Sequence, residues 1–129
     1  FQPVFPKLTR DVLEAAPVLE QVEISESENC QGFPGKCLFI WTDEYPSVAN
    51  HFEGIYLVVY DEANIYLFAA RPQRNGRYNM LVRGEYFKNG FSLEENFGNV
   101  LREGGEYRLA VFCPTAKEQV RRIRYRLEG

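Results

Sequence analysis

Short segments in which apolar and polar residues alternate constrain this fold more than any other feature of the sequence. Residues 18–25 and 120–127 alternate with a period of two, as expected for strands that have one face in water. Residues 55–60 and 65–70 are apolar segments of strand length, and the turn 61–64 between them indicates a β-hairpin. Together these segments predict a mainly β protein.

Further segments of strand length complete the pattern. Residues 37–42 are apolar on both parities and are predicted to form a central strand. A longer strand is predicted over residues 78–87, between the turns 71–76 and 88–90, and another over residues 107–113. About seven strands with short connections are typical of an antiparallel β-sandwich, which is the predicted fold, and a small closed β-barrel is the alternative.

The chain has the length of one domain, and its first segment differs from the rest. We assign residues 1–17 to an extended lead-in with a short helix and residues 18–129 to the strands. Thr9 can cap a helix over residues 10–16, and Pro17 ends it. The sequence therefore predicts a single β-sandwich domain with one short N-terminal helix.

The net charge argues against nucleic-acid binding, and the hydropathy argues against a membrane-spanning segment. Acidic residues outnumber basic residues by 18 to 15, so no general positive field draws the chain to nucleic acid. No apolar segment approaches the ~18 residues that a membrane span requires. We therefore expect neither nucleic-acid binding nor a membrane span.

Two of the three cysteines lie close together in the sequence, on either side of a Gly-Phe-Pro-Gly segment. A loop of this length can bring the Cα atoms of Cys30 and Cys37 to ~5.5 Å, the usual separation in a disulfide. The competing assignments are a Cys37–Cys113 disulfide and reduced thiols. A Cys30–Cys37 disulfide is the prediction, and it favours a secreted or periplasmic location. The chain starts at Phe1 rather than Met, which is expected of a processed product.

The single histidine limits metal binding and catalysis. His51 and the three cysteines would supply four zinc ligands, but the six-residue spacer between Cys30 and Cys37 is longer than in common zinc sites. His51 and Cys113 would form a nucleophile–base pair only in contact, and no known nucleophile motif surrounds either residue. We predict no metal, no cofactor and no catalytic residues, and a thiol- or His-dependent hydrolase is the remaining enzyme alternative.

The segment WTDEY, residues 41–45, is a candidate binding surface. Aromatic rings beside carboxylates stack on sugar rings, bond to their hydroxyls and also anchor protein interfaces. The candidate residues are Trp41, Asp43, Glu44 and Tyr45. In the competing interpretation Trp41 belongs to the core and the acidic residues form an ordinary turn.

The last strand carries the most regular pattern in the chain. Arg122, Arg124 and Arg126 share one face of it, and apolar or aromatic residues share the other. Guanidinium groups in such a row can bind a sulfated sugar, a phosphate, an acidic partner or an anionic membrane surface. The competing interpretations are a charged face that protects an edge strand, and cross-strand ion pairs with the acidic segment 20–28.

These features predict a non-catalytic binding module of a secreted or periplasmic protein. Another protein is the predicted partner, and an anionic or carbohydrate ligand is the alternative. The predicted binding residues are the three arginines of the last strand and the four residues of the WTDEY segment. A small barrel that carries an apolar ligand is a further alternative, because Tyr and Phe are abundant in the middle strands.

Overall fold

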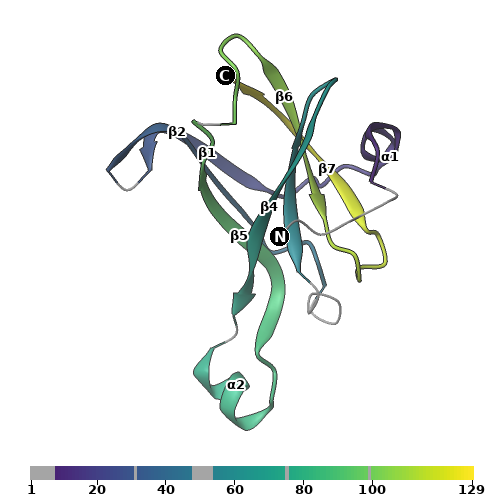
Figure 1. The fold of residues 1–129 in the computed structure, drawn as a ribbon. Coiled ribbons are helices and arrows are strands. Elements are labelled where there is room, and N and C mark those ends of the chain that lie inside the picture. The colour runs from purple at the N-terminus through teal and green to yellow at the C-terminus, as the bar shows by residue number, and fades with distance from the viewer. Residues whose placement is uncertain (1–7, 31, 48–53, 75, 99) are drawn as a thin grey trace.

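The computed structural model describes residues 8–30, 32–47, 54–74, 76–98 and 100–129, which form seven strands and two short helices (Figure 1). In chain order the elements are α1 Arg10–Ala15, β1 Glu23–Cys30, β2 Phe33–Thr42, β3 Ile55–Tyr60, β4 Ile65–Arg74, α2 Arg77–Val82, β5 Phe87–Asn96, β6 Glu106–Phe112 and β7 Val120–Glu128. The predicted mainly β fold with an N-terminal helix is confirmed.

The strands neighbour one another in the order β1-β2-β5-β4-β3-β6-β7, and all of these pairs are antiparallel. β4 joins the two halves, because its residues 65–70 pair with β3 whereas Arg71, Pro72 and Arg74 pair with β5. The sheet curls, and the two halves face each other across the core (Figure 1). The fold is therefore a mainly β, sandwich-like arrangement of one curled antiparallel sheet, in agreement with the predicted fold class.

The segment that precedes β1 belongs to the opposite half of the sandwich. Val18 forms a parallel bridge to Arg122 on β7. The Leu19 N–H donates to the Arg122 carbonyl at 2.7 Å, and the Arg122 N–H donates to the Pro17 carbonyl at 2.8 Å. The strand predicted over residues 18–25 therefore begins too early. The chain crosses from one half of the sandwich to the other before β1 begins at Glu23.

Side chains from both halves form the main hydrophobic core. Leu38 and Ile40 on β2, and Leu57 and Val59 on β3, are fully buried between them. Buried members from β5, β6 and β7 include Phe91, Leu93, Tyr107, Leu109, Val111, Ile123 and Leu127. The period-two alternation of the strands accounts for this arrangement, because every second residue points to the same side.

A second hydrophobic cluster lies on the outer face of β3 and β6, under α1. Leu13 of α1 is fully buried there against residues such as Val58 and Ala110. The helix begins at its predicted cap, because the Val12 N–H donates to the hydroxyl of Thr9 at 3.3 Å. α1 therefore covers the outer face of one half of the sandwich (Figure 1).

The connection between β5 and β6 is fixed to the core by a tyrosine. Tyr107 lies near the start of β6 and is 1% exposed. Its hydroxyl accepts a hydrogen bond of 2.9 Å from the backbone N–H of Arg102. This hydrogen bond holds the connection that leads into β6 against the core.

Cys30 and Cys37 form a disulfide, with their Cα atoms 5.2 Å apart. The predicted pairing is confirmed, and a Cys37–Cys113 disulfide is excluded because Cys37 is bonded to Cys30, whereas Cys113 lies buried in the core. The disulfide also removes two of the thiolates that the zinc alternative needs. His51 lies outside the described residues.

Three predictions in the β4–β5 connection are wrong. Residues 71–74 of the predicted turn 71–76 lie in β4, which continues to Arg74. Residues 78–87 do not form a strand, because Arg77–Val82 form α2 and Gly84 then takes a positive φ of 68° that ends the helix. Residues 88–90 are not a turn but lie in β5. Gly90 has a φ of 105°, and a Cβ atom there would lie 2.1 Å from the carbonyl oxygen of Thr42, so this glycine allows β5 to approach the end of β2.

Candidate functional site

The arginines of β7 lie on its outer face, as their shared parity predicts. Arg124 and Arg126 have 74% and 69% of their side-chain surface exposed. Arg122 is less exposed, and its Nε atom donates a hydrogen bond of 2.8 Å to the carbonyl of Ala16 at the end of α1. This contact fixes one guanidinium group beside the helix.

Acidic side chains lie close to these arginines. Arg124 is 3.6 Å from Glu20, and Arg126 is 3.8 Å from Glu106. On β6, Arg108 forms an ion pair and a hydrogen bond with Glu14 of α1. Glu20 belongs to the acidic segment 20–28 but lies before β1, so its contact with Arg124 is an ion pair with that segment and not a cross-strand pair.

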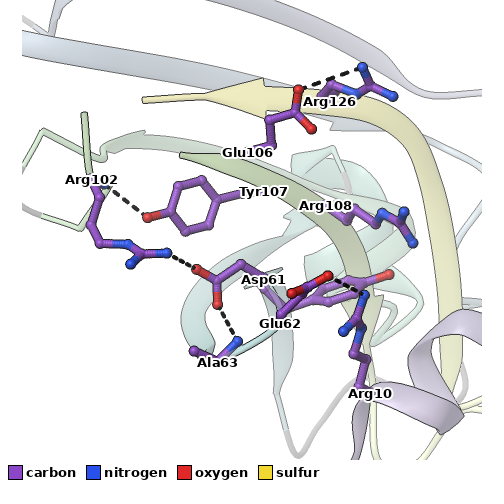
Figure 2. Close-up of a pocket in the computed structure, with 10 residues that line it drawn as sticks. Arg10, Asp61, Glu62, Ala63, Arg102, Glu106, Tyr107, Arg108 and Arg126 are labelled. Atoms are coloured by element: carbon purple, nitrogen blue, oxygen red, sulfur yellow. Dashed lines mark hydrogen bonds and ion pairs between the residues drawn. The ribbon is translucent and has the colours of Figure 1, made fainter. Parts of the chain in front are cut away.

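Two adjoining hollows follow this surface. The first has a volume of about 500 Å³, and its lining includes Arg108, Arg122, Arg124, Arg126 and Glu14. The second has a volume of about 430 Å³, shares Arg108 and Arg126 with the first, and extends to the β3–β4 turn (Figure 2). We refer to both hollows together as the arginine groove.

The two hollows of the arginine groove differ in charge. Four arginines and one glutamate line the first. Four arginines and three carboxylates line the second, and Figure 2 shows three arginines in contact with these carboxylates. The contacts join Arg10 to Glu62 at 4.0 Å, Arg126 to Glu106 at 3.8 Å, and Arg102 to Asp61 at 3.0 Å. The positive charge of the groove is therefore concentrated in the first hollow, along β7.

Asp61 forms hydrogen bonds within the β3–β4 turn. Its Oδ1 atom accepts hydrogen bonds from the backbone N–H groups of Ala63 at 2.9 Å and Asn64 at 2.7 Å. Burial by itself raises the pKa of Asp61, but these two bonds and the guanidinium of Arg102 outweigh it and lower the pKa. The turn predicted over residues 61–64 is therefore present, and Asp61 stabilises it.

The WTDEY segment is divided between two environments. Trp41 and Asp43 line an open hollow of about 590 Å³ against the β4–β5 hairpin. Tyr45 instead is buried, with its hydroxyl 2.6 Å from the carbonyl of Glu118, and burial raises its pKa. Glu44 accepts a hydrogen bond of 3.1 Å from the Gln21 N–H. Trp41 and Asp43 therefore line one hollow together, whereas Glu44 and Tyr45 make contacts within the fold.

Arg121, which the sequence analysis did not select, completes the network around Glu44 and Tyr45. Its side chain is 3.5 Å from the carboxylate of Glu44, and its guanidinium carbon lies 5.8 Å from the ring centroid of Tyr45. It also donates a hydrogen bond of 2.8 Å to the carbonyl of Val18. Arg121 ties β7 to the lead-in segment and to the turn after β2, so its role is in the fold.

The outer face of β1, β2 and β5 has no helix over it among the described residues. Phe39 on this face is 40% exposed, and Trp41 is partly exposed beside it. Their register partners are small or acidic, since Phe39 pairs with Ser25 and Glu94, and Trp41 pairs with Glu23 and Ser92. We refer to this surface as the bare face.

The β4–β5 hairpin carries an exposed apolar patch at its tip. Tyr78, Leu81, Val82 and Tyr86 are between 57% and 71% exposed, and α2 buries none of its residues. Figure 1 shows α2 at the far end of this hairpin, away from the rest of the sandwich. We refer to these four residues as the hairpin patch.

Sequence reasoning missed the hairpin patch because residues 78–87 were assigned to a strand. A signal was present, because Tyr78, Leu81 and Val82 are spaced i, i+3 and i+4, which is typical of one face of a helix. Arg83 lies over the ring of Tyr78, with its guanidinium carbon 5.9 Å from the ring centroid.

No helix among the described residues is long and apolar enough to cross a membrane. No protein-family model, no curated protein and no solved structure matches this chain.

Proposed function

We propose that this chain is a non-catalytic binding module of a secreted or periplasmic protein, and that it binds another protein through the hairpin patch. The observation that carries the proposal is the exposure of four large apolar side chains on one protruding hairpin. Large exposed apolar patches in folded proteins are frequently interaction sites, because their exposure to water is unfavourable. The Cys30–Cys37 disulfide is compatible with the extracytoplasmic location.

The surroundings of the patch indicate the chemistry of the partner. Segment 71–88 has five basic residues and one acidic residue, a net charge of +4 in a chain whose net charge is −3. Its basic residues are Arg71, Arg74, Arg77, Arg83 and Lys88. We infer a partner with an apolar contact site surrounded by acidic residues, because complementary charge accelerates association and excludes other partners.

A concave hollow beside Trp41 adjoins the hairpin patch. It lies between the end of β2 and the hairpin, and its lining includes Asp43, Arg83 and Phe87. A partner that covers the hairpin patch also reaches this hollow, since Arg83 lines the hollow and contacts Tyr78 of the patch. Trp41 and Asp43 from the WTDEY segment thus enter the proposed interface, whereas Glu44 and Tyr45 do not.

The test compares two double variants for binding to a purified partner. Proteins retained from extracellular fluid of the source organism are purified singly and titrated calorimetrically with the wild-type chain and with Leu81→Ser/Tyr86→Ser. The patch variant should weaken binding by about 30-fold or more, because truncating buried anchors at an interface costs about 2 kcal/mol or more.

The matched control is Arg124→Ser/Arg126→Ser, which changes two exposed residues on β7 instead. It should leave the affinity for the protein partner unchanged within about twofold, since it does not touch the hairpin. Both variants should keep the wild-type thermal unfolding midpoint, because all four side chains are exposed. The proposal is wrong if the chain retains no protein, or if the patch variant binds every retained protein like the wild type.

A further inference from the structure

The arginine groove is a second, separate surface of the molecule. It lies on the outer side of β6 and β7, next to α1. The hairpin patch belongs to the β4–β5 hairpin, in the other part of the sheet. We propose that the arginine groove binds a linear sulfated polysaccharide, independently of the protein partner inferred above.

The first hollow of the groove holds the positive charge that such a ligand needs. Arg108, Arg122, Arg124 and Arg126 reach it from two neighbouring strands, and Glu14 is the one carboxylate among the residues that line it. Guanidinium groups bind sulfate oxygens through paired, charge-assisted hydrogen bonds, and the fixed planar geometry of the group adds specificity. The hollow therefore presents several anion-binding groups within one open volume of about 500 Å³.

Two of the arginines are held in place before any ligand arrives. Arg122 donates through Nε to the Ala16 carbonyl, and Arg108 is paired with Glu14 of the same helix. Both contacts depend on α1, so the helix that covers this side of the sandwich also positions one wall of the hollow. Side chains that are already ordered lose less conformational entropy when a ligand binds.

The other two arginines have weak acidic partners that a ligand can replace. Arg124 is 3.6 Å from Glu20, and Arg126 is 3.8 Å from Glu106, with all four side chains more than 60% exposed. Exposed pairs of this kind contribute about 0–1 kcal/mol. A sulfate group that binds a guanidinium therefore displaces its carboxylate at little cost.

The arrangement favours a chain of anionic groups over a single compact anion. Arginines at alternate positions of a strand are ~6.6 Å apart along it, which forms a row. Compact phosphate sites usually depend on converging backbone N–H groups. β6 and β7 pair in an antiparallel ladder that shifts register between Arg108 and Leu109, so Arg124 lies in a bulge of β7 between the paired Arg122 and Arg126. The groove therefore offers arginine side chains distributed along one strand. A linear polysaccharide with repeated sulfates matches that geometry.

The test is titration calorimetry of the full chain with a heparin octasaccharide. The Arg124→Ser/Arg126→Ser variant should bind about tenfold more weakly or worse, because two charge-assisted contacts are lost. Arg71→Ser/Arg83→Ser removes the same charge from the β4–β5 hairpin and is the matched control, which should bind within about twofold of the wild type.

A third variant should strengthen octasaccharide binding instead of weakening it. Glu20→Gln/Glu106→Gln removes the competing carboxylates and should strengthen octasaccharide binding by about twofold or more, since each arginine then needs no displacement step. A desulfated octasaccharide should not bind, and inorganic sulfate at equal ionic strength should not displace the octasaccharide. Equal weakening by both arginine variants, or unchanged binding in the Glu20→Gln/Glu106→Gln variant, overturns the proposal, as does a wild-type chain that does not bind the octasaccharide.

Loss of this binding and loss of the protein partner are distinguishable. The Leu81→Ser/Tyr86→Ser variant should bind the octasaccharide like the wild type, because the hairpin patch is not part of the groove. If that variant loses both ligands, the two surfaces act as one site and their independence is disproved.

Discussion

The two outer faces of the sandwich are built from similar strands but are covered differently. On β3 and β6 the outward side chains form a second hydrophobic cluster, and α1 seals it with the fully buried Leu13. On β1, β2 and β5 the outward Phe39 stays 40% exposed, with no helix over it in the described part of the chain. One face thus contributes to stability, and the other is open to contact.

The comparison shows how one short helix divides the surface of a small β domain. By covering its face, α1 also brings Glu14 and the Ala16 carbonyl to the arginines beside it, which orders the groove there. The uncovered half projects the β4–β5 hairpin, whose α2 has no buried residue. Removing apolar groups under α1 should therefore lower the stability of the fold, whereas removing them from the β4–β5 hairpin should weaken binding.

The largest effect is expected from Leu13→Ala in α1. This change should lower the free energy of unfolding by about 3 kcal/mol, because it opens a cavity in the sealed cluster. The measurement is equilibrium denaturation in urea. The control is Phe39→Ala on the bare face, which should cost less than about 1 kcal/mol, since the ring is already in partial contact with water. Similar losses in both variants would show that the bare face is also a packed face.

The next effect concerns the disulfide in the uncovered half. Six of the eight β1 residues are exposed, so packing contributes little to the β1–β2 hairpin. Cys30→Ser/Cys37→Ser should lower the free energy of unfolding by about 2–3 kcal/mol, the loop-entropy value for a closed loop of this length. Reductant should destabilise the wild-type chain and leave the variant unchanged. A wild-type chain that gains two alkylated thiols without reductant would contradict the assignment.

The smallest of the three effects is pH-dependent and belongs to the covered half. Asp61→Asn should cost about 1 kcal/mol at neutral pH, because the carboxylate accepts two turn N–H groups. The folded state lowers the pKa of Asp61 below its ordinary value of 3.8, so its stabilisation is present above that pH and is lost as the pH falls through the folded-state pKa.

The measurement for Asp61 is urea denaturation of both proteins between pH 3 and pH 7, a range that spans the ordinary carboxyl pKa of ~3.9. The difference between wild type and variant should shrink toward the acid end. A constant difference across this range would mean that the ionised form of Asp61 has no special role in the turn.

Local patterns were sufficient where a feature depends on residues close in sequence. The β3–β4 hairpin, the cap at Thr9 and the Cys30–Cys37 pairing were all predicted. The helix α2 was missed although its i, i+3, i+4 spacing was readable, because a short apolar segment with aromatic residues also fits a strand. The burial of Tyr45 was missed because its partner, the carbonyl of Glu118, is 73 residues away in the sequence.

The sequence alone located six of the seven strands that the structure describes, all except β5, and indicated which of their residues share a face, because alternation is a property of the extended backbone itself. It placed three arginines on one side of the last strand before any contact was known. Only the tertiary structure decided that α1 covers the outer face of β3 and β6 and leaves that of β1, β2 and β5 bare. Such a choice rests on contacts between segments far apart in the chain, as Leu13 and Ala110 are, and no local pattern encodes them.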